Sequence, residues 1–218
     1  MANVKQQLET PSIPSLGFAP ATYEQRHFSE NYGALNTYFR KLVGALGALF
    51  GPMGGKDLNT PHGAFQDSTD QTAANTTTAY AVKFNTTDFS NGVTIASDSR
   101  ITVAVDGLWN IQFSFQFKNT TSDGQDVDIW FRKNGTNIDN SNSRFHLPAR
   151  KSAGDPSHLV TAMNFFATLV NGDYIEIMWR VTDTGVSLEQ FGTSTSPTRP
   201  AIPSAIVTVS FVSNLPTV

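Results

Sequence analysis

The spacing of apolar residues near the N-terminus predicts one amphipathic helix. Apolar side chains recur at alternating intervals of four and three residues, at Phe28, Tyr32, Leu35, Phe39, Leu42, Leu46 and Leu49. This spacing places them on one helix face and is also that of a coiled-coil seam. Pro52 and the glycines at 51, 54 and 55 follow. Because proline cannot continue a helix and glycine favours its C-terminal cap, we expect the helix to span residues 25–51.

Beyond a Gly/Pro linker at 52–63, the apolar period changes to two, as expected for strands with one buried face. In residues 109–117, Trp109, Ile111, Phe113, Phe115 and Phe117 alternate with polar residues. Asn134-Gly135 separates two such runs and predicts a hairpin turn. Eight to ten strands of this kind predict a β-sandwich or jelly roll over residues 64–218. Residues 140–157 lack the pattern, and we expect a surface loop there.

Residues 1–24 contain Pro11, Pro14 and Pro20 and show little periodicity, so they predict an extended arm. Apolar side chains are spaced along it at Ile13, Leu16, Phe18 and Tyr23. Proline lowers the conformational entropy lost on binding, which suits a segment that lies along another protein's surface.

The helix seam requires an apolar partner. One interpretation is the same helix from two other chains, which would form a short trimeric stalk; the other is packing on the chain's own β-domain. Gly44 and Gly47 weaken an isolated helix by about 1 kcal/mol each relative to alanine, although they also permit close approach to a neighbour. We expect a trimerisation or docking helix.

Charge and composition exclude several classes of partner. The 218 residues carry a net charge of −3, from 15 basic and 18 acidic residues, with no basic run. Nucleic acid and anionic membranes are therefore not expected partners. The apolar run Leu42–Phe50 is shorter than the roughly 20 residues that span a bilayer, so we expect no membrane insertion. The N-terminus lacks the apolar region of a signal peptide, and we expect synthesis in the cytoplasm.

The sequence contains no catalytic motif, and we expect no enzymatic activity, cofactor or metal. Its four histidines lack metal-ligand spacing, and there is no cysteine. Asp123, Asp126 and Asp128 cluster near a turn, where a polar loop is favoured over a calcium site. A pair of carboxylates that cleaves glycans need not be close in sequence, so a hydrolytic spike stays open as the weakest alternative. Glu176 alternates with buried positions and is expected to face solvent or a neighbouring chain.

The three tryptophans fall on two different faces. Trp109 and Trp179 follow the apolar period and are expected in the core. Trp130 lies out of phase with Ile129 and Phe131, which places it on the opposite face. There it would contact either a neighbouring subunit, which we favour, or a ligand.

Four segments in order resemble the C1q/TNF-like jelly roll over roughly residues 64–212. They are ITVAVDGLWNIQFSF (101–115), IWFRKNG (129–135), LVNGDYIEIMW (169–179) and AIVTVSFV (205–212). The resemblance implies a jelly-roll head that assembles as a homotrimer.

The arm, the helix segment ALNTYFRKL (34–42) and the opening of the β-domain at 63–85 are together similar to small virion proteins of tailed bacteriophages. This resemblance implies a non-enzymatic structural protein on the virion exterior, either a capsid decoration or a short tail fibre. The arm residues would anchor it to other capsid or tail proteins, and the helix would dock or trimerise. The alternative is an adhesin tip that binds a host receptor or glycan.

Overall fold

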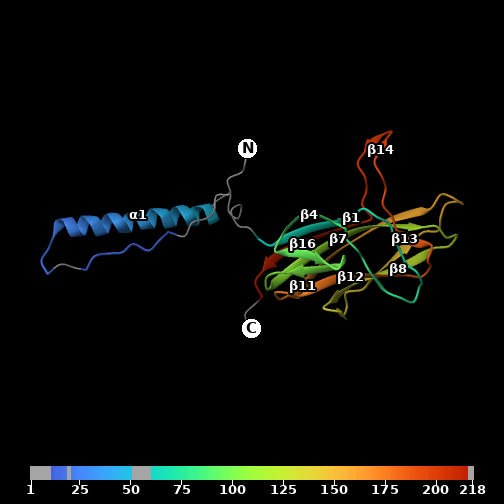
Figure 1. The fold of residues 1–218 in the computed structure, drawn as a ribbon, viewed down its shortest axis with the longest axis horizontal. Coiled ribbons are helices and arrows are strands. Elements are labelled where there is room, and N and C mark those ends of the chain that lie inside the picture. The colour runs from blue at the N-terminus through green and yellow to red at the C-terminus, as the bar shows by residue number, and fades with distance from the viewer. Residues whose placement is uncertain (1–10, 19–20, 51–59, 216–218) are drawn as a thin grey trace. The chain divides into compact units, whose positions relative to one another are not determined.

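The chain forms two compact units, residues 1–59 and 60–218. The computed structural model describes residues 11–18, 21–50 and 60–215 (Figure 1), except for the side chains of residues 48–50. The two units are treated separately below.

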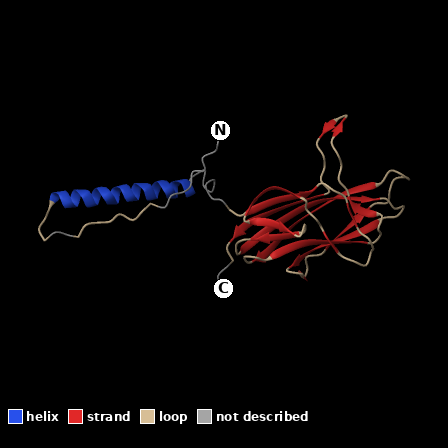
Figure 2. Cartoon of the chain, viewed as in Figure 1, coloured by secondary structure: helices blue, strands red, loops and turns tan. Residues whose placement is uncertain are grey.

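The N-terminal unit contains the predicted helix, α1 (Gln25–Phe50), drawn in blue in Figure 2. Its sequence is amphipathic along its length. Residues 11–18 form neither helix nor strand and run back along α1 (Figure 1). The backbone N–H of Gly17 donates to Asn31 Oδ1 at 3.3 Å. Residues 11–18 of the predicted arm thus lie against the chain's own helix, while residues 1–10 and 19–20 of that arm lie outside the described residues.

The C-terminal unit is an antiparallel β-sandwich, which confirms the predicted fold class. Its longer strands are β1 (His62–Asp67), β4 (Thr86–Asn91), β5 (Val93–Ala96), β6 (Arg100–Val103), β7 (Gly107–Asn119), β8 (Gln125–Lys133), β10 (Ser143–Leu147), β11 (Ser157–Leu169), β12 (Tyr174–Val181), β13 (Val186–Leu188) and β16 (Ala205–Ser213). Two-residue strands complete it: β2 (Gln71–Thr72), β3 (Tyr80–Ala81), β9 (Thr136–Asn137), β14 (Ser194–Thr195) and β15 (Thr198–Arg199).

Two sheets face each other in this unit. Sheet A has the order β2-β13-β7-β16-β1-β4, with β11 on the other side of β7. Sheet B has the order β10-β8-β12-β6-β5, with β3 beside β12 and β9 beside β8. Eight strands of these sheets pair in chain order from the outside inward: the first with the last (β1–β16), then β6–β12, β7–β11 and β8–β10. These pairs alternate between sheet A and sheet B, which is the connectivity of a jelly roll.

The core lies between the sheets and is rich in aromatic side chains. Trp109 and Trp179 are fully buried there, as predicted, together with Phe115, Phe117 and Phe131. The predicted hairpin is also confirmed: β8 and β9 pair through Lys133 and Thr136, and Asn134 and Gly135 have φ of 48° and 82°. Glycine and asparagine tolerate this left-handed backbone better than other residues.

Two predicted boundaries are wrong. The expected loop at 140–157 contains β10, which pairs along β8 from Ser143 to Leu147. Only Phe145 and Leu147 of β10 point inward. Two alternating apolar residues among polar neighbours are too few to predict a strand. In addition, β1 begins at His62, inside the expected linker, because His62 and Gly63 pair with β16.

Candidate docking surfaces

The N-terminal unit presents an exposed apolar surface, here called the helix stripe. It consists of Phe28, Tyr32, Leu35, Phe39, Leu42, Val43 and Leu46. Phe28, Tyr32, Phe39, Val43 and Leu46 have exposed fractions between 43% and 70%, while Leu35 and Leu42 are half-buried. The predicted seam is thus brought onto one face, except for Leu49, whose side chain lies outside the described residues.

The flanks of the helix stripe are uncharged. Asn31, Asn36, Tyr38 and Ala45 occupy the positions beside the seam where dimeric coiled coils often carry ion pairs. The middle of the stripe forms a hollow of about 530 Å³ between Tyr32, Phe39 and Val43, with Arg40 at its edge. A wide apolar face with a hollow and uncharged positions beside the seam suits packing against more than one helix.

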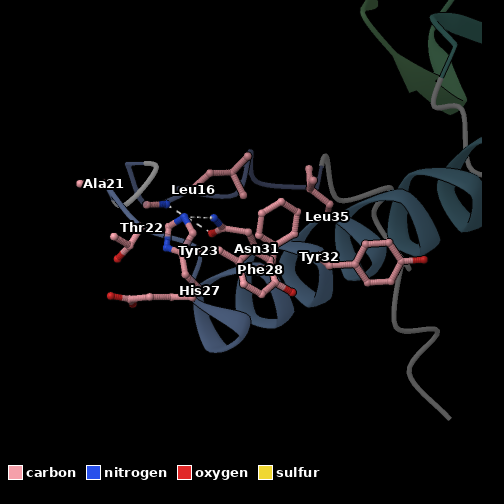
Figure 3. Close-up of a pocket in the computed structure, with 11 residues that line it drawn as sticks. Leu16, Ala21, Thr22, Tyr23, His27, Phe28, Asn31, Tyr32 and Leu35 are labelled. Atoms are coloured by element: carbon pink, nitrogen blue, oxygen red, sulfur yellow. Dashed lines mark hydrogen bonds between the residues drawn. The ribbon is translucent and has the colours of Figure 1, made fainter.

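The arm covers only part of this surface. A hollow of about 460 Å³ separates residues 16–17 and 21–24 from the first turns of α1, and the hydrogen bonds that meet at Asn31 line it (Figure 3). Leu16 lies in this hollow, and the rings of Tyr23 and Phe28 are 5.6 Å apart. Ile13 and Phe18 are 86% and fully exposed. Of the four predicted anchor residues, Leu16 and Tyr23 therefore lie beside the helix but remain 46% and 77% exposed, and the other two face solvent.

The outer face of sheet A is free of charge at its centre. Because Ile111, Phe113 and Phe115 point into the core, their alternating neighbours on β7 point outward. Each of these outward residues of β7 pairs with one residue of β16 on one side and one residue of β11 on the other, which gives three rows across the sheet. The rows, here called the neutral face, are Ser210-Asn110-Phe166, Thr208-Gln112-Asn164 and Ile206-Ser114-Ala162. Phe166 is 52% exposed.

The outer face of sheet B is charged, in contrast. Asp128 is buried there and accepts hydrogen bonds from Arg144 at 2.8 and 3.1 Å and from Arg180 at 2.9 Å. The hydrogen bond from Arg144, assisted by Arg180, lowers the pKa of the Asp128 carboxyl despite the opposing effect of burial. Sequence reasoning missed this cluster, because its three residues lie on three strands.

The expectation that Glu176 faces solvent or a neighbouring chain is wrong. Its side chain points away from the core yet is only 4% exposed. Arg132 donates to Oε2 at 2.9 Å, Ser99 donates to Oε1 at 2.8 Å, and Arg100 lies 3.8 Å from Oε1. Long arginine side chains from neighbouring strands cover the carboxylate.

Trp130 lies on this charged face, opposite the core, as predicted. It is half-buried, and its Nε1 donates to Asn137 Oδ1 at 2.9 Å. The favoured interpretation as a subunit contact fits this face less well than the neutral face, since interface centres are depleted of charged residues.

Two histidines of the sandwich lie beside a carboxylate. Asp126 is 2.8 Å from His146 Nδ1, and Glu189 is 2.8 Å from His158 Nε2. Within residues 11–18, 21–50 and 60–215, no group of three or more His, Asp or Glu side chains is placed to hold a metal ion.

Comparison with protein-family models finds no match, and comparison with curated proteins finds none either. In the described part of the chain, no helix has both the length and the apolar character needed to cross a membrane.

Proposed function

We propose that this chain is a non-enzymatic structural protein of a bacteriophage virion, which assembles as a homotrimer with a C1q/TNF-like head. The arm and α1 would dock it on capsid or tail proteins, and the sandwich would face outward as a decoration or short fibre. The observation that carries the proposal is the helix stripe, which is long, regularly spaced and largely uncovered.

The stripe favours copies of itself as its partners. Its residues keep the alternating spacing of a seam over three heptads, so identical helices in register set each apolar layer against itself. Because the positions beside the seam carry no charge, identical helices that pack along it do not repel each other there. Closed cyclic symmetry is the usual solution for soluble homo-oligomers.

The neutral face supports a second contact between the heads. A flat surface of amide, hydroxyl and apolar groups can be buried without leaving an unpaired charge, which would cost several kcal/mol. The exposed Ile13 and Phe18 of the arm remain available for a different protein of the particle.

The test has two parts. Light scattering of the purified chain is expected to give a mass near three times the 23.7 kDa of one chain. Immunogold labelling of intact virions is expected to place the protein on the outside of the capsid or tail. A stable monomer at micromolar concentration would overturn the homotrimer, and unlabelled virions would overturn the virion assignment.

A second candidate is an adhesin tip that binds a host receptor or glycan. The observation that favours it is a depression beside Trp130 on the charged face.

A further inference from the structure

A depression of about 410 Å³ opens beside Trp130 on the outer face of sheet B. Its lining combines one indole ring with short polar side chains from the segment between β9 and β10. The lining residues are Asp128, Trp130, Asn137, Ile138, Asp139, Asn140, Asn142 and Arg180.

The indole ring is held in place before any ligand arrives. Trp130 sits on β8 opposite Met178 of β12, and Met178 is buried although it points away from the core. The bond from Nε1 to Asn137 fixes the ring's rotation. A preorganised aromatic surface loses little conformational entropy on binding.

The rim of the depression has unused hydrogen-bonding capacity. The side chains of Asp139, Asn140 and Asn142 are exposed and make no hydrogen bond or ion pair with any residue that the structure describes. The amides can each donate and accept, and the carboxylate can accept. The backbone supports this presentation, because Asn140 adopts a positive φ of 59° in the turn.

We propose that this depression binds a neutral hexopyranose unit of a carbohydrate. A pyranose ring has an apolar face of C–H groups that stacks on an indole, and a rim of hydroxyls that both donate and accept hydrogen bonds. An aromatic platform surrounded by a few convergent polar groups is the matching arrangement. The inference deepens the second candidate function and does not depend on trimerisation.

Charge decides between neutral and anionic sugars. The guanidinium of Arg180 is already bound to Asp128, at 2.9 Å. Asp128 also binds Arg144, which lies outside the lining, and the lining itself contains two carboxylates, Asp128 and Asp139, against one guanidinium. The exposed carboxylate of Asp139 therefore leaves the lining with a net negative charge, which repels an anionic ligand. The depression therefore selects against sialylated or phosphorylated sugars.

The experiment uses the full chain and measures binding by saturation-transfer NMR. The probes are the methyl glycosides of glucose, galactose, mannose and N-acetylglucosamine, with the methyl glycoside of N-acetylneuraminic acid as the anionic probe. Indole fluorescence provides a second readout, because Trp109 and Trp179 are fully buried and Trp130 alone of the three is half-exposed. At least one neutral glycoside is expected to bind with a Kd of about 1 mM, as is typical for a small contact.

Three variants and one control test the location. Trp130→Ala is expected to weaken binding at least about tenfold, as truncation of a central aromatic contact does. Asn142→Ala, and Asn140→Gly, which keeps the left-handed turn, are expected to weaken binding without altering the fold. Tyr174→Ala is the matched control, since Tyr174 lies on the same face of sheet B, stacked with Arg100 and outside the depression.

The outcomes separate this proposal from the virion assignment. Absence of binding by every neutral glycoside, or equal binding by wild type and all three variants, overturns the sugar site and leaves the oligomeric state untouched. Preference for the N-acetylneuraminic acid glycoside over the neutral probes also overturns it. In support, Asp139→Asn is expected to admit the N-acetylneuraminic acid glycoside, which the wild-type chain excludes.

Discussion

Replacing Phe39 by aspartate is expected to dissociate the proposed homotrimer. Phe39 lies at the middle of the helix stripe and is 55% exposed in the single chain. A phenylalanine carries about 150–250 Å² of surface, so about 100 Å² remains to be buried against partner helices. At about 25 cal/mol per Å², that burial contributes about 2.5 kcal/mol per chain.

Three chains together would lose about 7 kcal/mol, or roughly five decades in the association constant. Because the monomer–trimer dissociation constant has units of concentration squared, the midpoint concentration of dissociation rises by the square root of this factor, roughly 300-fold. Three carboxylates brought together at one layer would add repulsion to this loss.

Sedimentation velocity over a dilution series measures this shift. The matched control is Thr37→Asp, which adds the same charge two residues away, on the opposite side of α1, where Thr37 bonds to the Gly33 carbonyl. Circular dichroism checks that the sandwich stays folded in both variants. If both variants dissociate at the same concentration as wild type, the helix stripe is not the trimer contact and the seam argument is wrong.

Three further outcomes follow from the same surfaces. Deleting residues 2–24 is expected to leave a folded sandwich that no longer co-sediments with particles lacking this protein, whereas full-length chain does; equal co-sedimentation would place the anchor elsewhere. Gln112→Lys, at the centre of the neutral face, is expected to weaken the trimer while the unfolding temperature of the monomeric sandwich stays unchanged; an unaltered trimer would exclude that face. Because folding lowers the pKa of Asp128, its stabilisation is present above about pH 5 and is lost as the pH falls through the lowered pKa. Asp128→Asn is therefore expected to cost about 2 kcal/mol at pH 7 and progressively less towards pH 2, measured by urea unfolding; a pH-independent difference would contradict this.

Local patterns in the sequence determined most of the secondary structure. The helix, the long strands, the Asn134-Gly135 hairpin and the core positions of Trp109 and Trp179 all follow from periodicity or turn chemistry. Each depends on residues a few positions apart, because one buried face imposes a repeat of 3.6 or 2 on its own segment.

Tertiary structure alone decided which strands lie side by side, and with them the chemistry of the two outer faces. Asp128 accepts hydrogen bonds from arginines 16 and 52 positions away, and Glu176 accepts one from a serine 77 positions away. No repeat within one strand encodes such pairs, because an outward polar residue has the same local pattern whether it meets water or an arginine. The same limit hid the neutral face, whose three rows come from three strands, and the polar rim of the Trp130 depression, which depends on β10 pairing where a loop was expected.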